Sequence, residues 1–212
     1  MSARDIFDNI EIYSPVVPLI FFFIRRSKRS RWSILLIIYL IVYISLVYAA
    51  NNFFVAKNNN IVYIILSGVT FCFFAFILEQ FLTSRKFKML NRTVMIIAVL
   101  FFIANALWWE GISIFNSYSS AIANLILGAY CVYYYKLQLE KPQIIFVEKL
   151  PSFWIVSGIF IYNSGNIFLY SMFNSLTRSN HVFTYEMWDI NIILILIMNV
   201  FFAKGIQCDW HK

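Results

Sequence analysis

The stretch that decides the fold is residues 16–50, which read VVPLIFFFIRRSKRSRWSILLIIYLIVYISLVYAA. Two apolar runs flank a loop with five cations, Arg25, Arg26, Lys28, Arg29 and Arg31. The second run, residues 32–50, has the length of a helix that crosses a bilayer, and it carries no charge. Loops rich in Lys and Arg beside such a helix stay on the cytoplasmic side. This loop therefore predicts the orientation of the whole chain.

The composition excludes a soluble fold. Hydrophobic residues make up 61% of the chain and charged residues 13%, and the mean hydropathy is +0.74. Soluble domains are about 45–50% apolar and about 25% charged. With 212 residues, the chain is expected to form a single all-α transmembrane domain, residues 1–212, with no separate soluble module.

Seven apolar segments predict a polytopic seven-helix bundle. The predicted spans are about residues 10–24, 32–50, 61–82, 93–109, 118–135, 152–173 and 188–207. The first is short and contains Pro15 and Pro18. Because proline removes a backbone donor and bends a helix, we expect this span to be kinked and packed against protein.

The distribution of charge predicts that the N-terminus lies outside and the C-terminus inside. On this layout, 14 of the 17 Lys and Arg residues fall on inner segments. Six acids fall at the outer side: Asp5, Asp8, Glu11, Glu110, Glu186 and Asp189. The net charge of +7 is therefore assigned to membrane topology and anionic lipid headgroups rather than to nucleic acid.

Polar side chains inside a span should face the bundle interior. In the sixth span, Tyr162, Asn166, Tyr170 and Asn174 recur every four residues, and so share one helix face. In the fifth span, Ser120 and Asn124 are spaced in the same way. These faces predict either hydrogen bonds between helices or a polar cavity that opens to the outside, and the sequence leaves both open.

The outer ends of the spans hold the candidate ligand-binding residues. They are Asn105, Trp109, Glu110, Asn163, Asn166, Tyr170, His181, Glu186 and Asp189. Glu110 follows the C-terminal end of its span, where the helix dipole disfavours an anion. We therefore expect a cation, ligand or proton near it, with Arg178 and His181 as candidates from the chain. Neutralising Glu110 should then impair binding more than stability.

Glu79 is the one acid well inside a span. Two interpretations remain open for its side chain. It either extends toward Arg85 and Lys86 at the inner surface, or it forms an interior ion pair or a proton-responsive group.

No motif for catalysis, a cofactor or a metal is found. Cys72, Cys131 and Cys208 lie within spans or at a span's inner end, an arrangement that predicts neither a disulfide framework nor a zinc site. The two histidines, His181 and His211, both fall outside the predicted hydrocarbon region. We expect no cofactor, and a non-enzymatic role is favoured although enzyme activity is left open.

Two stretches carry a resemblance to a known group. Residues 151–168, PSFWIVSGIFIYNSGNIF, and residues 79–82, EQFL, resemble a poorly characterised group of small bacterial seven-span membrane proteins associated with two-component signalling. The resemblance implies a role beside signalling kinases and implies no catalytic residue.

The sequence thus favours a sensor or signalling partner in a bacterial inner membrane, with an outward-facing polar pocket. Its expected partners are the lipid bilayer, a membrane protein or a second copy of the chain, and a small-molecule ligand. Because the inner loops are too short for an output domain, it would act through a separate protein. The alternatives are a small transporter or channel subunit, and a scaffold subunit of a membrane complex.

The predicted topology can be tested with a reporter that is active only outside the cytoplasm. Fusions at the N-terminus or near Asn58 should be active, because those positions lie outside. Fusions near Lys28, near Lys88 or at the C-terminus should be silent. An active reporter at the C-terminus would contradict seven crossings, because an even number would then be required.

Overall fold

The computed structural model describes residues 9–24, 30–53, 59–140, 146–179 and 181–208. Within them, the side chains of residues 53, 176–179 and 181–185 are not described. The basic residues at positions 25–29, which anchor the predicted topology, lie outside the described residues, whereas Arg31 begins a helix.

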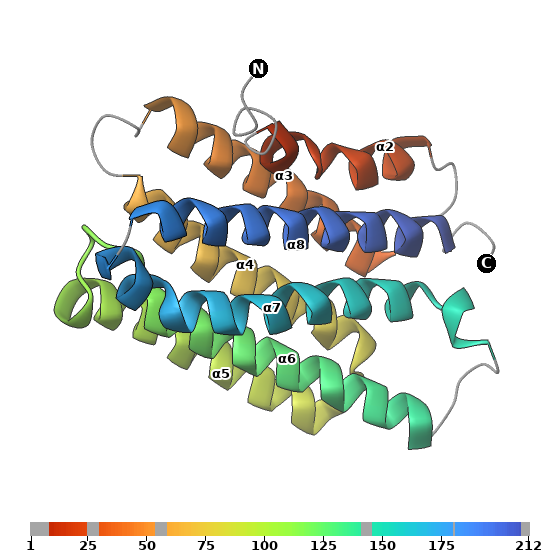
Figure 1. Cartoon of the computed structure of the whole chain (residues 1–212). Helices are drawn as coiled ribbons and strands as arrows, with labels where there is room; N and C mark the ends of the chain where they lie inside the picture. Colours follow the sequence, from red (N-terminus) through yellow and green to blue (C-terminus); the bar gives the residue numbers. More distant parts are fainter. Residues whose placement is uncertain (1–8, 25–29, 54–58, 141–145, 180, 209–212) are drawn as a thin grey trace.

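The described chain is an up-and-down helical bundle (Figure 1). A short helix at residues 9–13 leads into α2 (Val16–Ile24), which lies against α8 and touches α3. The long helices are α3 (Arg31–Phe53), α4 (Asn60–Phe81), α5 (Arg85–Ala104), α6 (Ser117–Glu140), α7 (Pro151–Ser179) and α8 (His181–Cys208). A π-helical turn η1 (Asn105–Trp109) extends α5, and a 3₁₀ turn η2 (Val147–Lys149) precedes α7.

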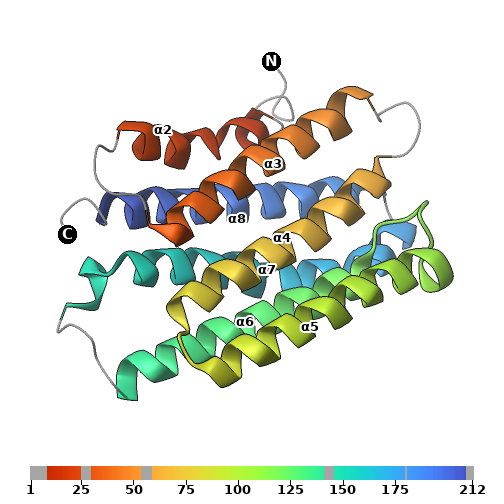
Figure 2. The same ribbon diagram turned by 180° about the vertical axis from the view of Figure 1, so that it is seen from behind.

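The long helices form two layers. Helices α6, α7 and α8 lie side by side in one layer, and α3, α4 and α5 form the other, as the opposite views in Figures 1 and 2 show. Helix α4 joins the layers, because it contacts α3 and α5 in its own layer and α6 and α7 in the other. This position places α4 at the centre of the bundle.

Each predicted span overlaps a helix of the described chain, the first of them overlapping the short helix at residues 9–13 together with α2. Five of them are long and apolar enough to cross a membrane: Arg31–Asn52, Asn60–Phe81, Arg85–Trp109, Pro151–Ser175 and Glu186–Cys208. The cations Arg85, Lys86, Lys88 and Arg92 were predicted to lie on a loop before the fourth span, but they form the first two turns of α5. The apolar run in the sequence therefore located the apolar part of α5 but not its polar first two turns.

Helix α6 is long enough but is not among the five apolar helices. At 24 residues it extends about 36 Å. Serines and an asparagine are among the residues that lower its hydropathy, and those side chains face the bundle: Ser117, Ser119, Ser120 and Asn124 are all buried. Because these polar side chains face the interior of the bundle, they are not exposed to lipid.

The first helix is broken, as the prolines predicted. A turn at residues 14–15 separates the helix at 9–13 from α2, and Pro15 and Pro18 are both buried. The side-chain amide of Asn199 on α8 donates to the Ser14 hydroxyl at 3.0 Å. This hydrogen bond fixes the break against α8.

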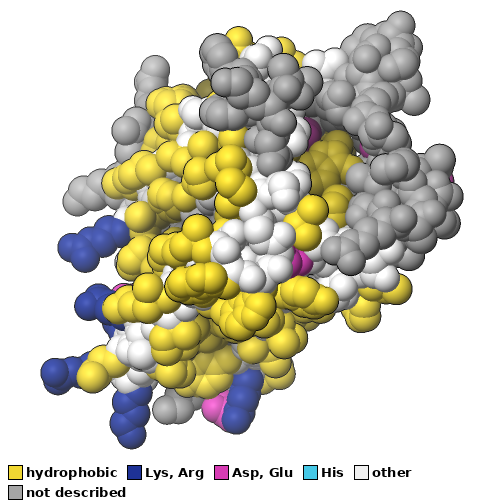
Figure 3. All heavy atoms as spheres, turned by 90° about the vertical axis from the view of Figure 1, so that its left-hand side faces the viewer, with side chains coloured by type: hydrophobic (Ala, Val, Ile, Leu, Met, Phe, Trp, Pro, Cys, Tyr) yellow, Lys and Arg dark blue, Asp and Glu magenta, His cyan; other side chains and the backbone are white. Residues whose placement is uncertain are grey.

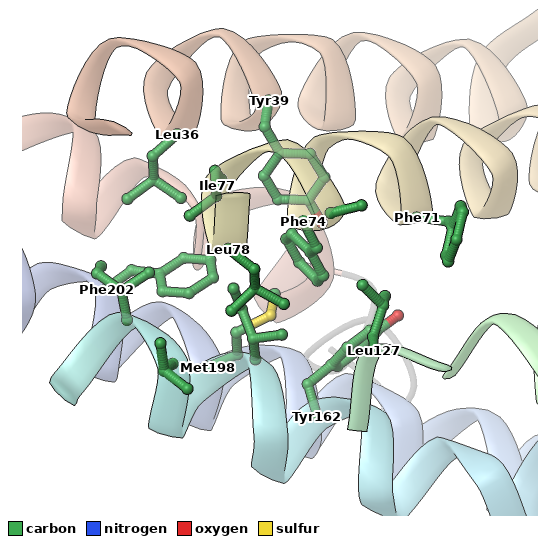
Figure 4. Packing of buried hydrophobic residues seen from close by; sticks show 14 of the residues in the cluster. Leu36, Tyr39, Phe71, Phe74, Ile77, Leu78, Leu127, Tyr162, Met198 and Phe202 are labelled. Atoms are coloured by element: carbon green, nitrogen blue, oxygen red, sulfur yellow. The ribbon is translucent and has the colours of Figure 1, made fainter. Parts of the chain in front are cut away.

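Aromatic rings fill the core around Phe74 of α4 (Figure 4). The ring centroid of Phe74 lies 4.8 Å from that of Tyr39 on α3, 6.1 Å from that of Phe202 on α8 and 6.2 Å from that of Tyr162 on α7. All three pairs are edge to face, the arrangement that aromatic quadrupoles favour. Phe74 itself is fully buried, so this one side chain ties both layers together.

Helices α7 and α8 are in the most extensive contact. Their backbones approach closely where α7 carries Gly158: a Cβ atom built on Gly158 would lie 3.0 Å from the Cβ of Phe201 and 3.2 Å from the carbonyl oxygen of Met198. Small residues permit such approach in membrane helices, where packing replaces the hydrophobic effect as the driving force.

Charge divides the bundle into two ends. Every Lys and Arg whose side chain is described lies within two turns of one end, here called the basic end: Arg31, Arg85, Lys86, Lys88, Arg92, Lys136, Lys149 and Lys204. The opposite, acidic end carries Glu11, Glu110, Glu186 and Asp189. Figure 3 looks onto the acidic end, where hydrophobic and uncharged side chains cover most of the described surface and Lys and Arg extend only from its edge.

The close contact at Gly158 predicts that glycine-to-alanine substitutions at two positions will differ in their effect on stability. Gly158→Ala should lower the thermal midpoint of the protein in detergent, because the new methyl group meets the α8 backbone, an overpacking cost of about 1–3 kcal/mol. Gly68→Ala is the matched control, since a Cβ there would have nothing within 4 Å, and alanine favours a helix by about 1 kcal/mol. Equal midpoints for the two variants would contradict close packing of α7 on α8.

Candidate functional site

A polar cavity lies between the helices in the half of the bundle nearer the acidic end. Its volume is about 30 Å³, enough for about two water molecules, since one needs about 10–15 Å³. The side chains with polar atoms in its wall are Glu11, Tyr43, Tyr63, Ser67, Thr70, Ser120, Asn124, Tyr162, Tyr170, Trp188 and Asn191. The short first helix, α3, α4, α6, α7 and α8 all contribute to this wall.

Helical spacing explains why these side chains meet. Ser120 and Asn124 are one turn apart on α6, and Ser67 and Thr70 are one turn apart on α4, so each pair shares a face. On α7, Tyr162 and Tyr170 are two turns apart and face the same space. The polar faces predicted for the fifth and sixth spans therefore converge, as one of the two interpretations required.

The cavity is closed toward the basic end by the aromatic core. Phe71, Leu127 and Tyr162 belong to both the cavity wall and the core cluster. To the left of Phe71 and Leu127 in Figure 4 lie Phe74, Leu78 and Phe202, which are fully buried. Within the described residues, the cavity thus ends at packed side chains.

Glu11 is the acid in this wall, and it was not among the residues predicted to bind a ligand. It was counted only as one of the outer acids, yet it is 2% exposed. Its carboxylate interacts electrostatically with the phenols of Tyr43, Tyr162 and Tyr170. One signal was present: Glu11 shares a helical face with Ser14, Pro18 and Phe22, which are all buried.

Of the residues predicted to bind a ligand, Tyr170 lines the cavity. Its hydroxyl donates to the amide oxygen of Asn191 on α8 at 3.3 Å. Both groups are buried, so this bond joins α7 to α8 at the cavity wall.

Asn163 and Asn166 are fully buried, as their spacing predicted, but they do not line the cavity. Each amide donates to a carbonyl one turn back on α7, Asn163 to Ile159 at 2.6 Å and Asn166 to Tyr162 at 3.0 Å. Their side-chain oxygens have no hydrogen-bond partner among the described residues. Both asparagines are therefore buried in the protein but are not part of the cavity wall.

Glu110 and Asn105 form a separate hydrogen-bond network at the acidic end. The Glu110 carboxylate accepts from the amides of Asn105 at 2.5 Å and Asn174 at 2.6 Å, and from the backbone N–H of Tyr118 at 3.3 Å. Asn105 also donates to Asn116. The network thus links the ends of α5 and α7 to the start of α6.

These hydrogen bonds place the Glu110 carboxylate differently from the expectation that it lies in the unfavourable field at a helix C-terminus. The chain turns at Gly111, whose φ is +78°, a conformation that glycine adopts without strain. The turn carries the carboxylate from the end of η1 to the first turn of α6, where the helix dipole favours an anion. N–H donors and α6 therefore stabilise the negative charge, and no external cation is needed to explain the position.

The other outer candidates do not converge on the cavity. Trp109 is 70% exposed on the bundle surface, a position typical of the aromatic belt at a membrane interface. Glu186 is exposed and Asp189 half-buried near the start of α8, and neither lines the cavity. His181 begins α8, and its side chain lies outside the described residues, as does that of Arg178.

Glu79 forms an ion pair with Arg92 on α5, and not with Arg85 or Lys86. The Glu79 side chain is 5% exposed, and its carboxylate lies 3.2 Å from the Arg92 guanidinium. Asn91 donates to it at 3.0 Å and to the Ala75 carbonyl at 3.2 Å. Arg85 and Lys86 begin α5 two turns earlier along that helix, so Arg92 is the cation whose position brings it to the buried carboxylate.

The described residues contain no group of three or more His, Cys, Asp or Glu side chains that could hold a metal ion. What the cavity offers is recognition: hydroxyls, amides, a carboxylate and aromatic rings around a small space. No protein family, curated protein or solved structure matches the chain. The resemblance to signalling-associated seven-span proteins stays a prediction.

The network around Glu110 predicts an effect on stability. Glu110→Gln places an amide donor against the donating amides of Asn105 and Asn174, and should cost about 1–3 kcal/mol, seen as a lower thermal midpoint in detergent. Glu186→Gln is the control, because Glu186 is an exposed acid at the same end. An unchanged midpoint with lost ligand binding would instead support the binding role predicted from the sequence.

Proposed function

We propose that this protein is a membrane sensor that binds a small polar ligand in the cavity and acts through a separate protein. On this proposal, the chain crosses a bacterial inner membrane seven times, with the acidic end outside and the basic end in the cytoplasm. The cavity then faces the outer side, and the partner binds at the basic end.

The observation that carries the proposal is a polar cavity that ends at a packed core. A transporter needs a path between both sides of the membrane, and the fully buried Phe74, Leu78 and Phe202 oppose such a path. A scaffold subunit needs no internal cavity. A cavity closed on its inner side is the arrangement that sensing requires, because occupancy changes the protein without moving the ligand across.

Helix α4 provides a route from the cavity to the basic end. It contributes Ser67 and Thr70 to the cavity wall and, about three turns further on, the buried Glu79 that pairs with Arg92. A ligand that shifts α4 would therefore act on the Glu79–Arg92 ion pair and on the start of α5. Such coupling requires that the ligand bind one arrangement of α4 better than another.

The basic end supports output through a partner. The α4–α5 connection is only residues 82–84, and Arg85 and Lys86 beside it are exposed. A connection of this length holds no output domain, but exposed cations can bind acidic groups on another protein. The charge of this end also suits a cytoplasmic position.

The proposal can be tested by photocrosslinking from position 86 in native membranes, with a photoreactive residue in place of Lys86. We expect the wild-type chain to crosslink to one abundant membrane protein. Ser67→Leu, which fills the cavity, should change the crosslinking yield at least twofold because α4 transmits the change to the basic end. Val69→Leu is the matched control on the same helix, since Val69 faces a groove between α4 and α5 outside the cavity.

Two results would contradict the proposal. The first is the absence of any crosslinked protein from position 86. The second is the same yield for Ser67→Leu, Val69→Leu and the wild-type chain, because the cavity would then have no influence on the basic end.

A further inference from the structure

The cavity wall has an unusual balance of charge for the centre of a helical bundle. Its described residues include one carboxylate, Glu11, and no Lys, Arg or His. Hydroxyl groups of serine, threonine and tyrosine provide further oxygen atoms. We propose that the cavity binds a small monovalent cation, of the size of ammonium, beside Glu11; the inference rests on the proposed function for the cavity and names its ligand.

The position of Glu11 favours a cation. Glu11 is 2% exposed and lines the cavity together with Tyr43, Tyr162 and Tyr170. Attraction between unit charges grows as the local dielectric constant falls, so a cation in this space is held more strongly than at the surface. Ionisable residues inside membrane proteins commonly mark ion sites.

A second observation points to an occupant. Ser120 Oγ and Asn124 Nδ2 both belong to cavity-lining side chains, which are 2% and 7% exposed, and neither atom has a hydrogen-bond partner among the described residues. Buried polar atoms are nearly always bonded. The Ser120 oxygen can accept from an ammonium N–H or coordinate a metal cation. The Asn124 amide needs an acceptor, which a water molecule bound to the cation supplies.

The volume of the cavity and the aromatic rings in its wall limit which cations can bind. The space of about 30 Å³ admits a cation with one water molecule and excludes a tetraalkylammonium ion. Tyr43, Tyr63 and Trp188 line the cavity, and aromatic faces attract ammonium groups and other cations. Calcium takes six to eight oxygen ligands, several of them carboxylates, so a single carboxylate favours a monovalent ion.

The experiment uses the full chain, purified and placed in nanodiscs of a neutral lipid. Its thermal midpoint is measured against the concentration of ammonium, methylammonium, potassium or sodium chloride, with N-methylglucamine chloride holding the ionic strength constant. We expect a saturable rise in the midpoint with at least one of these cations and none with tetramethylammonium.

Variants locate the site. Glu11→Gln should weaken the apparent affinity at least tenfold, whereas Glu186→Gln, at an exposed acid of the same end, should leave it unchanged. If Glu11→Gln fails to fold, Ser120→Ala provides the test, because it removes an uncharged oxygen and should weaken affinity severalfold.

The inference is overturned if no cation raises the midpoint beyond N-methylglucamine, or if Glu11→Gln and Ser120→Ala both titrate like the wild-type chain. Its failure is distinguishable from failure of the proposed function. No cation effect together with a changed crosslink in Ser67→Leu removes the cation and leaves the sensor. A cation effect that requires Glu11, with unchanged crosslinking, supports the cation site and removes the sensor.

Discussion

Hydrocarbon outside the bundle is as apolar as the side chains inside it, and the rest of the structure follows from this constraint. Helices in such surroundings gain little from burying more leucine, so they associate through close packing and internal hydrogen bonds. The asparagines Asn91, Asn105, Asn116, Asn163, Asn166, Asn191 and Asn199 are all at most 3% exposed. On the outside of α5, by contrast, Ile96 and Leu100 are 64% and 60% exposed, as a lipid-facing surface requires.

Internal polarity is arranged in three levels along the bundle. At the basic end, Glu79 joins α4 to α5 through Arg92 and Asn91. At the acidic end, Glu110 joins α5, α6 and α7. Between these levels lie the apolar core around Phe74 and, next to it, the polar cavity with Glu11. The two outer levels consist of side chains that bond directly to one another, whereas the middle level encloses a space. Among the described residues, Ser120 Oγ and Asn124 Nδ2 in the wall of that space have no hydrogen-bond partner, so the cavity is the place for a ligand.

Much of the helical layout was predictable because hydropathy is a property of each segment alone. The apolar runs located the long helices, and the prolines located the break after residue 13. Polar residues four apart located inward faces, so the burial of Asn163 and Asn166 was correctly predicted. The start of α5 was missed, because the cations at Arg85–Arg92 resemble a loop in composition although they form helix.

The roles of individual acids were not predictable in the same way. Glu110 follows a helix end in sequence, and only the turn at Gly111 brings it to the start of α6. Glu79 pairs with a cation on the neighbouring helix that lies farther along the chain than those considered. In both examples the contacts formed depend on how two helices meet, which spacing along one helix does not specify.

The sequence by itself determined that this is a helical membrane protein, where its long helices lie, and that cations gather at one end and several acids at the other. Those properties depend on local composition and spacing. Only the tertiary structure decided that Glu11 enters a cavity with Tyr43, Tyr162 and Tyr170, while Glu186 and Trp109 remain outside it. The physical reason is that such contacts depend on the rotation and tilt of each helix, which packing between distant segments sets.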